Sequence, residues 1–277
     1  MYKQKLGMSL ACDQRIDKTI KLLKQIGFDA VSPTWHAEYL KDAVLAAKEA
    51  EMILQSLHAP FDNVDKMWSE NKEISQPVIF RLMSALEDCN RYEIPIMVSH
   101  VWIGFDNIGT PNGAGFENFS KVIEKAKEYG VKIAFENTEG DNYLYALMEH
   151  FKGNDTVGFC WDSGHEMCYN YSKDLLADFG DRLLATHLND NLGISDFDGK
   201  IYWTDDLHLL PFDGIADWDY NAKRLKNSSK LEILNFELNI RSKPGRYENL
   251  CYERMTPEEY YTECYKRACR VAAKIIF

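Results

Sequence analysis

The chain alternates short apolar runs with longer amphipathic segments along its whole length. The short runs are rich in β-branched and aromatic residues and are bounded by turn-forming residues, which is typical of buried strands. The longer segments repeat apolar residues every three or four positions, as in Ile16–Ile26 and Phe116–Tyr129, which predicts helices. Eight strands are predicted, near Leu6–Cys12, Phe28–Trp35, Met52–His58, Ile96–Trp102, Val131–Glu136, Val157–Asp162, Leu183–Leu188 and Leu231–Leu238.

This alternation predicts parallel strands joined by crossover helices. Gly27 and Gly130 stand between a predicted helix and the next strand, where glycine lets the chain leave a helix. Eight such units in 277 residues match a closed barrel, and no glycine-rich turn typical of a doubly wound sheet follows the first strand. Because no linker or charge block divides the chain, we predict an α/β protein with a single-domain (β/α)8 TIM barrel over residues 1–277.

The net charge of −11 argues against a general affinity for nucleic acid, which depends on Lys and Arg contacts to phosphates. Seven cysteines without a C-x-x-C pair or zinc-ribbon spacing are typical of a reduced cytosolic chain. The first residues lack the apolar stretch of a signal peptide, and no run approaches the roughly 20 apolar residues that span a bilayer. We therefore expect a cytoplasmic protein that acts on a small molecule, with its oligomeric state left open.

Residue types that commonly bind metals stand at the ends of six of the eight predicted strands. The carboxyl ends of parallel strands meet at one mouth of a barrel, where barrel active sites lie. Any one of these side chains alone is more often structural, but six strands in register favour a shared site. The residues are His58, His100, Glu136, Asp162 with His165, His187 and Glu237, and the loop after the seventh strand adds Asp206 and His208.

The mixture of imidazole and carboxylate groups suits a transition metal, whereas a site without histidine would suit magnesium or calcium better. We therefore expect a divalent transition metal as cofactor, manganese, cobalt or zinc, with more than one ion left open.

Three runs carry a family resemblance: I-A-F-E-N-T-E-G (133–140), V-G-F-C-W-D-S-G-H (157–165) and T-H-L-N-D (186–190). Together with D-D-L-H-L-L-P-F-D-G-I-A-D-W (205–218) and F-E-L (236–238), they resemble the xylose isomerase-like TIM barrel superfamily. That superfamily includes sugar-phosphate isomerases and epimerases and the apurinic (AP) endonucleases of the endonuclease IV type. The motifs are specific for the superfamily and not for one activity within it.

The isomerase and epimerase branch implies one metal held by Glu136, Asp162, His187 and Glu237, with His165 beside the substrate. Such an enzyme moves a proton at the carbon next to a carbonyl through a metal-stabilised enediolate. Glu136 and Glu237 come from different strands, so one could remove the proton and the other return it. Pure metal ligation is the alternative role for both carboxylates.

The endonuclease branch implies three zinc ions, and all nine of its ligand positions have a counterpart here. The loops after His58 and His100 are nevertheless acidic and aromatic, which suits a neutral polyol better than a DNA backbone. The nuclease assignment gives one zinc to Glu136, His58 and His100, a second to Glu136, Asp162, His187 and Glu237, and a third to His165, Asp206 and His208.

The loop after His187 lacks the Arg that is usual in ketose 3-epimerases, which argues against that activity. A barrel without catalysis is a third alternative.

Substrate contacts are expected from residues at the strand ends. Trp35 and Trp102 are the first candidates for an apolar wall against a sugar ring. Arg241, in the turn R-S-K-P-G-R after the last strand, is a candidate for a phosphate or carboxylate on the substrate. The sequence leaves open which sugar or polyol is bound and whether it is phosphorylated.

Overall fold

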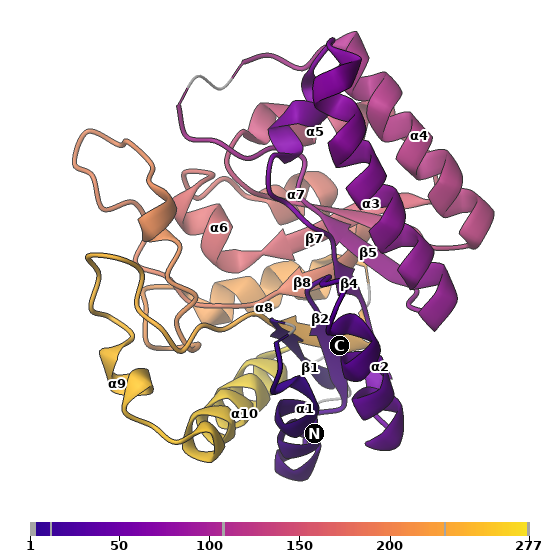
Figure 1. Ribbon diagram of the computed structural model, residues 1–277. Coiled ribbons are helices and arrows are strands. Elements are labelled where there is room, and N and C mark those ends of the chain that lie inside the picture. The colour runs from indigo at the N-terminus through magenta and orange to yellow at the C-terminus, as the bar shows by residue number, and fades with distance from the viewer. Residues whose placement is uncertain (1–3, 12, 107–108, 230, 276–277) are drawn as a thin grey trace.

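The computed structural model describes residues 4–11, 13–106, 109–229 and 231–275. Parallel strands run through the middle of the molecule, and helices surround them (Figure 1). The strands are β1 (Lys5–Leu10), β2 (Ala30–Pro33), β3 (Ile53–Leu54), β4 (Leu57–His58), β5 (Ile96–Ser99), β6 (Lys132–Glu136), β7 (Val157–Asp162), β8 (Leu183–His187) and β9 (Ile233–Phe236).

The strands form a closed ring. One sheet has the order β3-β2-β1-β9, and the other has the order β4-β5-β6-β7-β8. Parallel bridges from Thr34 to His58 and from Leu188 to Phe236 join the two sheets at both edges. Because β3 and β4 are two halves of one predicted strand, the ring has eight strands in the described part of the chain, and the predicted (β/α)8 class is confirmed.

Helices connect successive strands and pack outside the ring. Gly27 and Gly130 follow α1 and α4 with φ angles of 125° and 70°, so both predicted helix ends are confirmed. The helices are α1 (Ile16–Ile26), α2 (Leu40–Glu49), α3 (Lys72–Tyr92), α4 (Gly113–Tyr129), α5 (Asp141–His150), α6 (Ser163–Cys168), α7 (Leu175–Phe179), α8 (Trp218–Asn227), α9 (Leu250–Glu253) and α10 (Pro257–Lys274), with 3₁₀ turns η1 (Val64–Trp68), η2 (Gly180–Arg182) and η3 (Trp203–Asp205).

The strands alternate between two apolar layers. Side chains that face the helices belong to the large core, which includes Met97, Ile133 and Phe159. The opposite faces of β5 to β8 form a separate small cluster of Val98, Ala134, Cys160 and Ala185. Because side chains two positions apart share a face of a strand, the residues that follow this cluster by two positions also point into the barrel. These residues are His100, Glu136, Asp162 and His187.

The observed strands are shorter than most of the predicted ranges. The predicted strand 52–58 is interrupted at Gln55 and Ser56, and Cys12, the end of the first predicted strand, lies outside the described residues. Within the ranges that the structure describes, no helix is long and apolar enough to cross a membrane.

Candidate metal centre and active site

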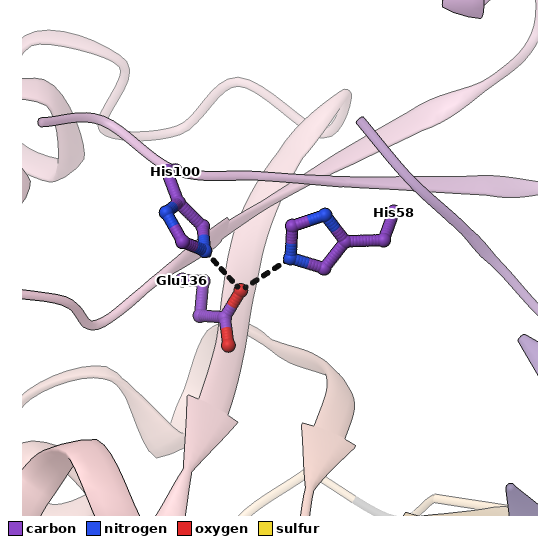
Figure 2. A group of neighbouring side chains, drawn as sticks. All are labelled: His58, His100 and Glu136. Carbon is purple, nitrogen blue, oxygen red and sulfur yellow. Dashed lines mark ion pairs between the residues drawn. The ribbon is translucent and has the colours of Figure 1, made fainter. Parts of the chain in front are cut away.

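Glu136, the last residue of β6, lies at the centre of the strand-end cluster. Its side chain is 0% exposed. Oε1 of Glu136 lies 2.8 Å from Nδ1 of His187, the last residue of β8. Oε2 faces two histidines from the neighbouring side of the barrel, with 3.2 Å to Nε2 of His58 and 3.3 Å to Nε2 of His100 (Figure 2). One carboxylate therefore contacts three imidazole rings from three other strand ends, and Nδ1 of His165 lies 3.6 Å from its Oε1.

Neither of the two contacts to Oε2 is a hydrogen bond. This buried oxygen has no hydrogen-bond partner among the described residues. A buried polar atom without a partner is costly, and such an atom is a signature of a missing ion or water. Two ring nitrogens and a carboxylate oxygen that converge without a shared hydrogen bond suit a cation between them. The donor set at Glu136 thus fits a transition metal.

A second donor group shares Glu136 with Asp162, His187 and Glu237. One ligand atom from each of these four residues lies within 4.8 Å of the other three. Nδ1 of His187 lies 2.8 Å from Oε1 of Glu136 and 2.8 Å from Oε2 of Glu237, so the two carboxylates flank one ring nitrogen. Four donors of oxygen and nitrogen at this spacing could hold one transition metal ion.

Burial and neighbouring charges shift the pKa values of these residues. Burial alone would raise the pKa of Glu136, but His187, His100 and His58 together hold it well below its usual value. Burial acts in the same way on Glu237, whose contact with His187 lowers the pKa to about 2. Burial would lower the pKa of His187, but Cys160, Glu237 and Glu136 raise it well above the usual value. Without metal, a protonated His187 therefore balances the carboxylates that a metal ion would otherwise neutralise.

Backbone carbonyls fix the orientation of three histidines. Nδ1 of His58 lies 2.8 Å from the carbonyl oxygen of Ala59, and Nδ1 of His165 lies 2.9 Å from that of Asn137. His208 makes the same contact at 2.9 Å with the carbonyl of Glu237. Since a carbonyl only accepts, Nδ1 carries the proton in each ring. With Nδ1 engaged in this way, Nε2 of each ring faces the cluster, as a lone pair for a metal when the ring is neutral or as an N–H donor when the ring is protonated.

Two asparagines that the sequence analysis did not single out position Asp162. Nδ2 of Asn189 donates to both carboxylate oxygens of Asp162, at 3.1 and 3.0 Å. Asn137 accepts from the backbone N–H of Asp162 at 2.8 Å. Gly164 leaves room for this arrangement, because a Cβ there would lie 1.9 Å from Oδ1 of Asn189. The sequence signal was the Asn that follows Glu136 in F-E-N and the one that follows His187 in H-L-N.

The third zinc site implied by the endonuclease alternative, His165, Asp206 and His208, is only partly present in the structure. Asp206 contacts both of its predicted partners, at 3.5 Å to Nε2 of His165 and 2.8 Å to Nε2 of His208. Among the described residues, however, the donor group within 4.8 Å around these histidines is Asp162, His165 and His208, without Asp206. Oδ2 of Asp206 also lies 3.2 Å from Nζ of Lys243. An ammonium group thus already neutralises the carboxylate that a third zinc would need.

A cavity of about 430 Å³ opens above the cluster. Glu136 and Glu237 line it, whereas Asp162 and His187, the other two members of the four-residue group, do not. Its remaining described lining combines further metal-binding residue types with aromatic and apolar groups and one cation: His58, Phe61, His100, Ile103, Phe105, Glu139, His165, Tyr169, Trp203, Asp206, His208 and Lys243.

Sequence comparison fits this geometry. The sequence profile of the xylose isomerase-like TIM barrel family matches residues 20–273. The chain belongs to that family. The uncharacterized protein y4fM of Sinorhizobium fredii is 38% identical over 128 residues, covering 44% of this chain and 38% of y4fM. A probable endonuclease 4 of Natranaerobius thermophilus is 23% identical over 182 residues, covering 58% of this chain and 63% of that protein. These matches span less than two thirds of either relative.

Solved structures share the fold of this xylose isomerase-like barrel. The IolI protein with a bound zinc atom superposes with a TM-score of 0.75 at 19% identity, covering 99% of both chains. The 3-keto-D-glucoside 4-epimerase YcjR from E. coli gives 0.71 at 15% identity, over 97% of this chain and 100% of YcjR. A D-psicose 3-epimerase crystallised in the presence of D-fructose gives 0.72 at 12% identity, over 98% and 99%.

The three residues expected to contact a substrate, Trp35, Trp102 and Arg241, are not among the residues that line this cavity. Nε1 of Trp35 donates to Asp88 of α3 at 2.9 Å, so the ring lies against the outer helices. Trp102 stacks on Tyr143 with ring centroids 4.1 Å apart. Arg241 lines a separate cavity and not this one. In the described part of the chain, the aromatic residues that line this cavity are Phe61, Phe105, Tyr169 and Trp203.

Proposed function

We propose that this protein is a divalent-metal-dependent isomerase or epimerase of a sugar or polyol ketone. The observation that carries the proposal is that Glu136 and Glu237 line the cavity whereas Asp162 and His187 do not. The same four residues suit one metal ion, yet only two of their carboxylates face the space where a substrate would bind. The side chain of Glu237 is partly exposed, and the buried Glu136 lies in the wall beside it. Two carboxylates at one cavity are what proton transfer between two positions requires.

The metal would be held by Glu136, Asp162, His187 and Glu237. When bound, it would polarise the carbonyl of the substrate and so acidify the neighbouring C–H bond. One glutamate accepts that proton while the C–H electron pair shifts toward the carbonyl oxygen. For an epimer, the other glutamate takes up a proton from solvent and delivers it to the opposite face of the carbon, and the first glutamate then releases its own proton to solvent. For an isomer, the proton is delivered to the former carbonyl carbon, while the neighbouring hydroxyl loses its proton to the former carbonyl oxygen.

His165 would position the substrate. Its Nδ1 is engaged by the Asn137 carbonyl, which leaves Nε2 directed toward the cavity wall at Asp206. Burial would lower the pKa of His165, but Asp162 and Asp206 raise it well above its usual value. A protonated ring at this place donates a hydrogen bond to a carbonyl or hydroxyl oxygen of the substrate.

The test measures proton exchange directly. Protein loaded with manganese or cobalt is incubated in D2O with a panel of ketoses, inositol-derived ketones and their phosphates. We expect deuterium to enter at the carbon beside the carbonyl in at least one compound. Glu237→Gln should lower this rate by about 10²–10⁴, the usual contribution of a general base or acid. Glu149→Gln, at an exposed carboxylate on α5, is the matched control.

A phosphodiesterase of the AP endonuclease kind is the second candidate. The group of His58, His100 and Glu136 favours it, because this group could hold another ion that shares Glu136. Against it stand the aromatic lining and the ammonium of Lys243 beside Asp206. Cleavage of an abasic-site duplex by the zinc-loaded protein, with no deuterium exchange in any sugar or ketone, would reverse the ranking.

A further inference from the structure

A second cavity, of about 620 Å³, lies on the rim of the barrel mouth. Its walls come from the start of α1, the segment that follows β9, and the first turns of α10. All three lie at the carboxyl end of the barrel. The start of α1 follows the carboxyl end of β1, and the chain after β9 leads to the start of α10, which then runs back along the outside of the barrel. The segment after β9 contributes to both cavities: Lys243 lines the cavity over the metal-binding residues, and Arg241 and Ser242 line the rim cavity.

The rim cavity concentrates positive charge in a chain whose net charge is −11. Arg15, Lys18 and Arg241 line it, and Glu253 is its one carboxylate among the described lining residues. Arg15 makes an exposed contact of 3.4 Å with Asp13, but no carboxylate of the described residues lies within 4.0 Å of Lys18 or Arg241. Glu253 is already engaged by the backbone N–H of Ser242, at 2.8 Å. Two cations therefore remain without a protein counter-charge.

Two hydroxyl groups of the same lining are buried without an oxygen or nitrogen partner. They are Oγ of Ser242 and the phenol of Tyr260, a residue that is only 2% exposed and has just the Cys264 thiol beside its hydroxyl. Because burial raises the pKa of Tyr260, its hydroxyl stays a neutral donor. Since the Cys264 thiol is beside the Tyr260 hydroxyl, Oγ of Ser242 is the group of this pair that lacks a partner among the described residues, and such a group points to a ligand or water.

From these observations we propose that the rim cavity binds the phosphate group of a small phosphorylated molecule. Arg and Lys side chains with hydroxyl donors are the usual partners of a phosphate dianion, and Arg can bind it through two parallel hydrogen bonds. Barrels often bind phosphate near the loops of their last strands. Leu22, Ile240 and Pro257 add an apolar wall, and the volume exceeds the needs of a free phosphate ion.

The binding test needs no turnover, so it stands apart from the proposed isomerase activity. Inorganic phosphate is titrated by calorimetry into the protein as isolated. We expect the double variant Lys18→Ala/Arg241→Ala to weaken binding at least about tenfold. The control Lys223→Ala/Arg91→Ala removes the same charges from α8 and α3, away from the cavity, and should bind as the parent does. Lys243→Met tests the neighbouring cavity and should also leave phosphate binding unchanged.

The results separate the outcomes. Equal binding by Lys18→Ala/Arg241→Ala and the parent would overturn the proposal, as would loss of binding in Lys243→Met alone. A further outcome is that a DNA duplex displaces inorganic phosphate better than sugar phosphates do, and loses this ability in the double variant. That result would assign the rim cavity to nucleic acid and overturn the proposal as well. The phosphate group could belong to the substrate or to a separate effector, and kinetics distinguish the two. A substrate phosphate predicts a higher KM in the double variant for a ketose phosphate but not for the free ketose. An effector predicts that inorganic phosphate changes the rate with the free ketose in the parent only.

Discussion

The ammonium group of Lys243 lies 3.2 Å from Oδ2 of Asp206, inside the cavity over the metal-binding residues. The same carboxylate oxygen lies 2.8 Å from Nε2 of His208. A fixed positive charge at this spot opposes a cation between His165, Asp206 and His208, since a unit charge a few ångströms away is worth on the order of 4 kcal/mol at an effective dielectric constant near 20. The position of Lys243 therefore argues against a third metal ion at this spot.

Metal stoichiometry follows from that relationship. We expect elemental analysis of unchelated protein to find one transition metal ion in the group of Glu136, Asp162, His187 and Glu237, at most a second beside His58 and His100, and no third. Lys243→Met removes the charge but keeps the length of the side chain, so an additional ion should bind at least about tenfold more tightly than in the parent. Lys223→Met, on the outside of α8, is the matched control. Three equivalents in the parent protein would contradict this account.

Loss of one ligand should release the metal. His187→Ala removes the ring nitrogen that lies 2.8 Å from both Glu136 and Glu237, so metal should be lost at chelator concentrations that the parent tolerates. His36→Ala, at an exposed histidine, is the control. Equal retention of metal by His187→Ala and the parent in a chelator titration would refute the four-residue assignment.

Asn189, which donates hydrogen bonds to Asp162, should also contribute to metal affinity. Asn189→Ala deletes two hydrogen bonds to the carboxylate of Asp162. Partners of this kind typically contribute 10- to 100-fold in metal affinity, so we expect a weakening in that range. Competition with a fluorescent chelator measures it. An unchanged affinity would mean that Asp162 is held in place without Asn189.

The positions of the strand-end residues could be predicted because two simple periodicities fix them. Parallel strands end at one mouth, and alternate side chains share a face, so His100, Glu136, Asp162 and His187 had to converge once the strands were located. The roles of Trp35 and Trp102 could not be predicted in this way. Their surroundings are Asp88 and Tyr143, which are distant in sequence and are brought near by helix packing.

The position of Lys243 could not be predicted from the sequence either. In sequence it belongs to the basic turn R-S-K-P-G-R, in which all three cations are equivalent. In the structure Arg246 is paired with Asp205 and Glu248, Arg241 lines the rim cavity, and only Lys243 enters the cavity over the metal-binding residues. The path of the loop, which no local pattern encodes, decides between them.

Metal binding should release protons at neutral pH. His187 has a pKa well above its usual value in the metal-free protein, so it is protonated at pH 7 and must lose that proton to bind metal. Affinity should therefore fall as the pH is lowered, and proton release should fade once the pH exceeds the raised pKa. Calorimetry in buffers of different ionisation enthalpy measures the number of protons. No release at pH 7 would contradict the charge balance described for the cluster.

A buried ion pair outside the metal-binding cluster should dominate local stability. NH1 of Arg224 on α8 lies 2.7 Å from Oε1 of Glu166, with side chains only 10% and 6% exposed. Arg224→Ala leaves that carboxylate buried without its partner, which should cost about 3–5 kcal/mol in the free energy of unfolding. Urea denaturation measures the loss. Lys223→Ala, at the neighbouring exposed position, should change stability by less than about 0.5 kcal/mol.

Glu139 should contribute to substrate binding without holding the metal. It lines the cavity and belongs to none of the four donor groups found among the described residues. Oε1 accepts the backbone N–H of Gly104 at 2.7 Å, and burial raises the pKa of this carboxyl group. Glu139→Gln keeps an acceptor for Gly104 but replaces the carboxylate that faces the cavity by a neutral amide.

We therefore expect Glu139→Gln to keep its metal content and its stability while kcat/KM falls about tenfold, which corresponds to one hydrogen bond of roughly 1.4 kcal/mol to a substrate hydroxyl. Because that hydrogen bond is made by the bound substrate as well as in the transition state, the loss should appear mainly in KM. Glu139→Ala should show the same kinetic loss and also be less stable, since Gly104 loses its acceptor. A fall in kcat with unchanged KM would instead place Glu139 among the groups that act on the reacting carbon. Loss of metal in Glu139→Gln would show that this carboxylate supports the metal-binding cluster itself.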